Sequence, residues 1–105
     1  MSNPCMFTQD TFATYAKTLL TDHSLVFVDE EHTATKFAKG GDHAELARMA
    51  CDVDTSHMTI SNDNGELGTI FLVNEYDFDK ERQTVEIYNH SLGVDSLVPQ
   101  DEDED

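Results

Sequence analysis

The fold is decided in residues 57–73, HMTISNDNGELGTIFLV, where two strand patterns meet at a turn. The first half alternates between polar and apolar side chains, so Met58 and Ile60 fall on one face of a strand. The turn Asn62–Gly65 follows, and its Asn and Gly residues tolerate the positive φ that tight hairpin turns require. Residues 67–73 supply an apolar return strand. We therefore expect an antiparallel β-hairpin here.

Three further segments flank this hairpin with clear patterns. Residues 84–88 alternate as in a strand, and residues 24–29 form a short apolar run that is typical of a buried strand. Residues 8–22 place apolar side chains at helical spacing, and Thr8 can cap the start of that helix.

Residues 30–39 fit two patterns. Ala34 and Phe37 have helical spacing, whereas Thr33 and Thr35 alternate with Phe37 as in a strand. The helical interpretation is preferred, with the strand as the alternative.

The Gly40–Gly41 pair ends this element in either case, and Asp42 with Glu45 is close to a capping box at the start of another helix. Hairpin-linked strands after a helical half indicate an α+β fold: a small antiparallel β-sheet of three to four strands packed by two to three helices. We expect residues 1–98 to form a single acidic domain. Residues 99–105 end in five consecutive acids and are expected to form a disordered acidic C-terminal tail.

Charge is the second strong signal in the chain. The sequence has 22 Asp and Glu residues against 6 Lys and Arg residues, a net charge of −16. The acids crowd the second half, since 1–50 carries seven acids and four cations, whereas 51–105 carries fifteen acids and two cations. Duplex DNA carries one charge per ~1.7 Å, so this charge corresponds to about 27 Å of duplex. Self-repulsion of that size destabilises a compact fold, and we therefore expect a basic partner that offsets it.

Two groups of acids are candidate partner-binding residues. In residues 74–82 an acid stands at every second position, and an extended strand would project all four from one face, about 6.7 Å apart, like a row of phosphates. A second group follows the predicted strand 24–29. The alternative for the first group is a solvated edge, because charged edge strands resist pairing. The predicted partner-binding residues are Glu75, Asp77, Asp79, Glu81, Asp29, Glu30 and Glu31.

Patterns for metal binding and catalysis are weak. Asp52 and Asp54 begin like a calcium loop, but His57 occupies the sixth position, where the sharp turn needs glycine. The five histidines have no zinc-type spacing. The sequence has no glycine-rich phosphate loop and no nucleophile elbow. We therefore expect no catalytic residue, metal or cofactor, and no enzymatic activity.

The chain has no apolar run near the ~18 residues of a membrane span and no signal-peptide pattern at its start. Cys5 and Cys51 are accordingly expected to be free thiols in a reducing cytoplasm, that of the host cell if the protein is phage-encoded.

These expectations favour a non-enzymatic inhibitor, a DNA-mimic protein of phage or mobile-element type. It would occupy the basic nucleic-acid-binding surface of a target such as a defence nuclease or CRISPR effector. Anti-restriction and anti-CRISPR proteins have similar charge and size, although no motif is shared. The alternatives are an immunity or antitoxin-type partner of a basic toxin, a halophilic protein, and a small metal-dependent domain. We expect a basic protein partner, no direct binding of nucleic acid or membrane, and a monomer or homodimer.

Overall fold

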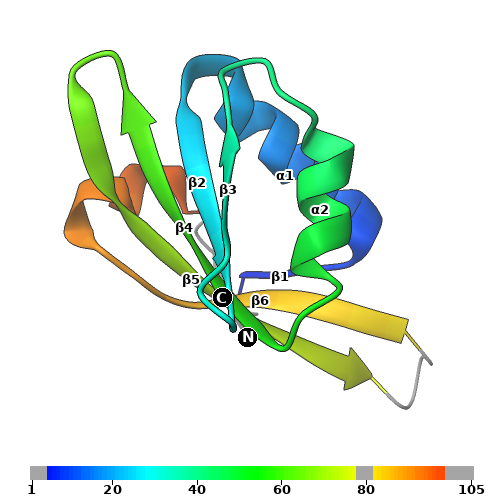
Figure 1. Ribbon diagram of the computed structural model, residues 1–105. Coiled ribbons are helices and arrows are strands. Elements are labelled where there is room, and N and C mark those ends of the chain that lie inside the picture. Colours follow the sequence, from blue (N-terminus) through cyan, green and yellow to red (C-terminus); the bar gives the residue numbers. More distant parts are fainter. Residues whose placement is uncertain (1–4, 78–81, 99–105) are drawn as a thin grey trace, which may run out of the picture.

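The computed structural model describes residues 5–77 and 82–98, which form one six-stranded antiparallel sheet and three helices. The strand order across the sheet is β1-β6-β5-β4-β2-β3 (Figure 1). The elements are β1 (Cys5–Phe7), α1 (Gln9–Asp22), β2 (Ser24–Asp29), β3 (Ala34–Phe37), α2 (His43–Ala50), β4 (Thr55–Asn62), β5 (Gly65–Asp77), β6 (Arg82–His90) and the 3₁₀-helix η1 (Leu92–Leu97).

The α+β class is confirmed, with two α-helices and one 3₁₀-helix against a single sheet. The sheet has six strands rather than the expected three to four. One additional strand is β1, which is too short to show a period in the sequence, and it pairs with β6. The other is β3, which lies in the segment that we expected to be helical.

Both predicted helix starts are confirmed. The Thr8 hydroxyl accepts a hydrogen bond from the backbone N–H of Thr11 at 3.3 Å, and the Thr11 hydroxyl accepts one from the backbone N–H of Thr8 at 2.8 Å. Asp42 caps α2 by accepting a hydrogen bond from the backbone N–H of Glu45 at 3.1 Å. These contacts satisfy backbone donors that have no partner within a helix.

The predicted helix over residues 30–39 is wrong. The segment forms a loop and then β3, which pairs antiparallel with β2, with Phe37 opposite Leu25. Phe37 is buried and Thr35 is half-buried, whereas Ala34 and Lys36 are exposed, so the alternating pattern prevails. Phe37 is buried against the sheet core in this pairing, which outweighs a weak helix propensity.

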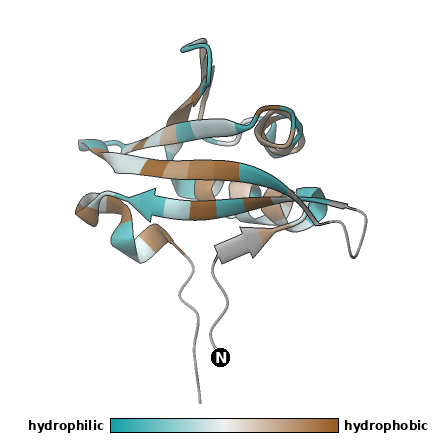
Figure 2. Cartoon of the chain, turned by 90° about the horizontal axis from the view of Figure 1, so that it is seen from below, coloured by the Kyte–Doolittle hydropathy of each residue, from teal (hydrophilic) through white to brown (hydrophobic). Residues whose placement is uncertain are grey.

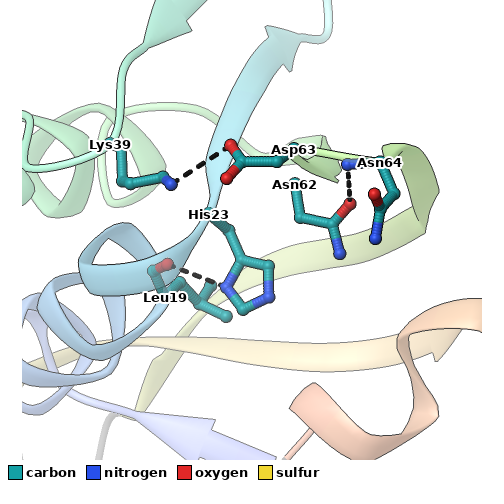
Figure 3. Close-up of polar contacts among 6 residues, drawn as sticks. All are labelled: Leu19, His23, Lys39, Asn62, Asp63 and Asn64. Atoms are coloured by element: carbon teal, nitrogen blue, oxygen red, sulfur yellow. Dashed lines mark hydrogen bonds and ion pairs between the residues drawn. The ribbon is translucent and has the colours of Figure 1, made fainter.

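The central hairpin and its turn are confirmed. Met58 and Ile60 are fully buried on one face of β4. At the turn, the Asn62 side-chain oxygen accepts a hydrogen bond from the backbone N–H of Asn64 at 2.8 Å (Figure 3). Gly65 has φ of 123°, which only glycine adopts readily. β5 extends well beyond the predicted end at residue 73.

One face of the sheet, here called the inner face, carries the core. Residues alternate in hydropathy along the strands (Figure 2), and every second residue joins one cluster with α1, α2 and η1. The buried apolar residues of the sheet are Leu25, Phe27, Phe37, Met58, Ile60, Ile70, Leu72, Val85 and Ile87. Those of the helices are Phe12, Ala16, Leu19, Leu20, Leu46, Ala47, Ala50 and Val94. The opposite, outer face of the sheet carries none of the described helices.

The end of the described chain is fixed to the inner face. Val94 of η1 is fully buried, and the Tyr15 hydroxyl of α1 donates a hydrogen bond to the carbonyl of Leu97 at 2.7 Å. A Cβ on Gly93 would lie 1.8 Å from the carbonyl oxygen of Leu67, so only glycine fits there. The predicted acidic tail, residues 99–105, lies outside the described residues. No helix in the described part of the chain is long and apolar enough to cross a membrane.

Candidate interaction surface

The fold brings the two predicted groups of acids to the same end of the sheet. At this end β2 and β5 finish and β4 begins, because Asp29 pairs with Ser56 and Thr55 pairs with Val73. It lies in the lower part of Figure 1, away from the β4–β5 turn at the top. We call this region the acidic end. Its described residues are Asp29, Glu30, Glu31, Asp52, Asp54, Glu75 and Asp77, the last placed by its backbone.

Asp29 has a structural role in the loop between β2 and β3. One of its carboxylate oxygens accepts hydrogen bonds from the backbone N–H groups of Glu31 and Thr33, both at 2.9 Å. A short carboxylate that bonds to backbone groups a few residues ahead is a common way to close a tight loop. His32 completes the turn with a φ of 67°. Asp29 therefore shapes the loop, and Glu31 is exposed at its tip.

Glu30 joins this loop to the connection between α2 and β4. Its carboxylate accepts a hydrogen bond from the backbone N–H of Asp54 at 3.2 Å. The carbonyl of Asp54 in turn accepts a hydrogen bond from the backbone N–H of Asn74 in β5 at 2.8 Å. These contacts hold the exposed Asp54 between the two predicted groups, and the exposed Asp52 precedes it by two residues. In the sequence these two acids have only the spacing of a weak calcium-loop pattern.

The row predicted in residues 75–81 is only partly described. Glu75 is exposed and pairs with Thr84 across β5 and β6, and Asp77 pairs through its backbone with Arg82. Asp79 and Glu81 lie outside the described residues, so their common orientation stays a prediction.

Two of the described cations, Lys39 and Arg48, form ion pairs with acids that do not belong to the acidic end. Lys39 contacts the Asp63 carboxylate at 3.3 Å beside the β4–β5 turn (Figure 3). Arg48 donates to Glu45 through Nε at 3.0 Å, and this hydrogen bond holds the pKa of the Glu45 carboxyl below its ordinary value. No ion pair of the described residues involves an acid of the acidic end, although the hydrogen bond to Glu45 and, less strongly, the charge of Asp52 raise the pKa of Arg48.

The described side chains offer little for metal or nucleophilic chemistry. Among the side chains that the structure describes, no group of three from His, Cys, Asp or Glu lies close enough to hold a metal ion. An open depression of about 330 Å³ is lined by Thr8, Gln9, Asp10, Cys51 and Gln83. Burial raises the pKa of the Cys51 thiol, so near neutral pH it stays protonated and is a poor nucleophile. Cys51 forms no disulfide.

Comparison with known proteins does not place the chain in a family. No family model, curated protein or solved structure matches it. Its function must therefore be argued from the charge and geometry of its own surface.

The outer face of the sheet holds a feature that the sequence analysis missed. His57 of β4, Phe71 of β5 and Tyr88 of β6 lie in one row across the sheet, which we call the aromatic row. The ring centroids of His57 and Phe71 are 5.6 Å apart, and those of Phe71 and Tyr88 are 6.2 Å apart. Tyr88 is 57% exposed, although it is a large aromatic residue. The alternation of residues 67–73 was the available signal, since Phe71 falls opposite in phase to Ile70 and Leu72.

Proposed function

We propose that this protein is a non-enzymatic acidic inhibitor that occupies the basic nucleic-acid-binding surface of another protein in the cytoplasm. The observation that carries the proposal is the convergence of acids from three separate chain segments at one end of the sheet. Carboxylates there can take the place of phosphates in contacts with Arg and Lys.

The size of the charge supports the same function. The protein measures 41 × 33 × 21 Å and carries a net charge of −16, the charge of about 27 Å of duplex DNA. A field of that strength accelerates encounter with a cationic surface and repels nucleic acid itself. A halophilic protein would not need acids gathered at one end, so this arrangement favours a partner-binding function.

The acidic end also has the rigidity that recognition needs. Glu30 is bonded to Asp54, and Asp54 is bonded to β5, so the acids are held on a connected frame rather than on independent loops. A preorganised surface loses less conformational entropy when it binds.

The test compares two variants of equal charge. The first replaces three exposed acids of the acidic end, Asp52→Asn, Asp54→Asn and Glu75→Gln. The control replaces three exposed acids away from this end, Asp22→Asn, Asp63→Asn and Glu66→Gln. Each variant removes three negative charges, so an effect of net charge alone would weaken partner binding equally in both variants.

Each variant and the parent are used to purify partners from the source cell, and the captured protein is identified by mass spectrometry. We expect a nucleic-acid-binding protein whose affinity falls about tenfold or more with the first variant and changes little with the control. Duplex DNA should displace the parent from this partner. A partner that binds both variants equally, or that binds DNA and the protein together, would contradict the proposal.

A further inference from the structure

The outer face of the sheet is an open surface of aromatic and apolar side chains beside carboxylates. The aromatic row runs from His57 of β4 through Phe71 of β5 to Tyr88 of β6, and Val28 of β2 pairs with His57 at its end. Phe71 and His57 are only half-buried, and Tyr88 is largely exposed. All described helices pack on the inner face, so the rings have no cover from them.

Tyr88 is on the outer face by the regular alternation of β6, because Val85 and Ile87 are buried on the inner face. Leu72 pairs with Ile87 and Phe71 pairs with Asn89, so Tyr88 is an additional residue in β6. A β-bulge of this kind sets two residues of one strand opposite a single residue of its partner. Here Tyr88 and Asn89 are both opposite Phe71, and the Tyr88 ring lies beside the Phe71 ring.

Carboxylates lie directly beside the aromatic row, on its side toward the acidic end. Val73 follows Phe71 on the outer face of β5, and Glu86 of β6 pairs with Val73. Glu75 follows Val73 on the same face. Same-face neighbours along a strand are about 6.7 Å apart. On the far side of the row the face has hydroxyls, with the Thr59 and Thr69 oxygens 3.2 Å apart. The rings and the carboxylates thus form one continuous surface.

This combination fits one side chain better than any other. A guanidinium group is planar and weakly hydrated, so it stacks on aromatic rings while its N–H groups pair with carboxylates. A lysine ammonium can make the ion pair but gains less from a ring face. Nucleic acid bases also stack on aromatic rings, but the phosphates that accompany them are repelled by the surrounding acids.

We infer that the aromatic row and its neighbouring acids, Glu75 and Glu86, form a docking surface for arginine side chains of the partner. The inference rests on the proposed function, which it deepens: the partner surface is rich in arginine, and some of its arginines stack on Phe71 and Tyr88. The rings take the place that bases occupy in an arginine-lined nucleic-acid site, and the carboxylates take the place of phosphates. A second copy of this chain is a less suitable occupant, because face-to-face pairing would bring two strongly negative molecules together.

The experiment measures binding of oligoarginine and oligolysine peptides of equal length at physiological salt. The ring-deleted variant carries Phe71→Leu and Tyr88→Leu, which keep apolar bulk on the sheet. The control, Leu92→Ala, removes an exposed apolar side chain outside the aromatic row, one that is 91% exposed. We expect the parent to prefer oligoarginine by about fivefold or more, and the ring-deleted variant to lose this preference while its affinity for oligolysine is unchanged.

A second measurement does not depend on any variant. In the ¹⁵N NMR spectrum of the parent, oligoarginine should shift the amide signals of His57, Phe71 and Tyr88, whereas those of α1 should stay in place. Equal affinity for the two peptides overturns the inference and leaves the proposed function intact. Failure of both peptides to bind contradicts the proposed function itself. A dimer that dissociates when the rings are deleted would also overturn the inference, because it assigns this face to a second copy.

Discussion

The Glu30 carboxylate accepts a hydrogen bond from the backbone N–H of Asp54, 24 residues further along the chain, at 3.2 Å. This contact joins the loop after β2 to the connection that leads into β4. It brings a glutamate from one acidic segment against the backbone of another, although their carboxylates repel each other. The acidic end is therefore a built feature of the tertiary structure rather than a run of solvated loops.

Replacing Glu30 tests this contact. Glu30→Ala should destabilise the protein by about 1 kcal/mol and accelerate hydrogen exchange at the Asp54 amide, because that donor loses its partner. Glu30→Gln keeps an acceptor oxygen and should stay within about 0.5 kcal/mol of the parent. Urea unfolding and amide exchange measure the two effects. Equal exchange at Asp54 in both variants would show that the bond does not persist in solution.

Gly93 should be intolerant of any side chain. A Cβ there would meet the carbonyl oxygen of Leu67 at 1.8 Å, so Gly93→Ala must displace η1 or β5. We expect a loss of about 1–3 kcal/mol or more in unfolding free energy. The neighbouring Leu92→Ala is the control, since Leu92 is almost fully exposed and its truncation should change stability by less than about 0.5 kcal/mol. Similar melting temperatures for the two variants would contradict the position of η1.

The pKa of Glu45 should depend on Arg48. The hydrogen bond from Arg48 lowers the pKa of the folded Glu45 carboxyl below its unfolded value. Its contribution to stability is therefore present above the unfolded pKa and is lost as the pH falls through the folded pKa. In Arg48→Gln, an NMR titration of the Glu45 carboxyl should show a higher midpoint than in the parent. Arg48→Lys, which keeps the charge but loses the planar fork, should fall between them. An unchanged midpoint in Arg48→Gln would rule out the pair.

Added salt should stabilise the free protein and weaken its complex. Between about 0.01 M and 0.15 M salt the screening length falls from ~30 Å to ~8 Å, which relieves repulsion among the acids. The same screening weakens attraction to a basic partner. Thermal unfolding and titration with oligoarginine at several salt concentrations measure both trends. Affinity that does not change with salt would indicate an apolar interface instead.

The Cys51 thiol should react slowly in the folded protein. It is only 8% exposed, and its pKa is raised by burial, so little thiolate forms near neutral pH. In a Cys5→Ser variant, alkylation at pH 7 followed by mass spectrometry should be about tenfold slower or more before unfolding in urea than after it. Equal rates would show that the segment around Cys51 opens readily.

Local sequence patterns correctly predicted those segments whose conformation does not depend on what packs against them. Thr8 and Asp42 cap helices because a short polar side chain bonds to its own backbone, whatever packs nearby. The Asn62–Gly65 turn formed as expected, since its conformation is a property of those residues. The helix predicted for residues 30–39 was wrong because Phe37 fits the apolar face of a helix and that of a strand equally well. Pairing with β2 decided between them, and that partner is not visible in a local window.

In the candidate surface, too, some features follow from local sequence and others depend on tertiary contacts. The sequence by itself determined the net charge, the acids in segments 29–31 and 75–81, and the α+β class, because these follow from composition and short-range periodicity. Only the tertiary structure decided that Glu30 meets Asp54 and that Phe71 lies beside Tyr88. The first contact depends on two chain segments crossing at one end of the sheet. The second depends on the pairing of β5 with β6, where a β-bulge sets both Tyr88 and Asn89 opposite Phe71, and neither strand shows that register by itself.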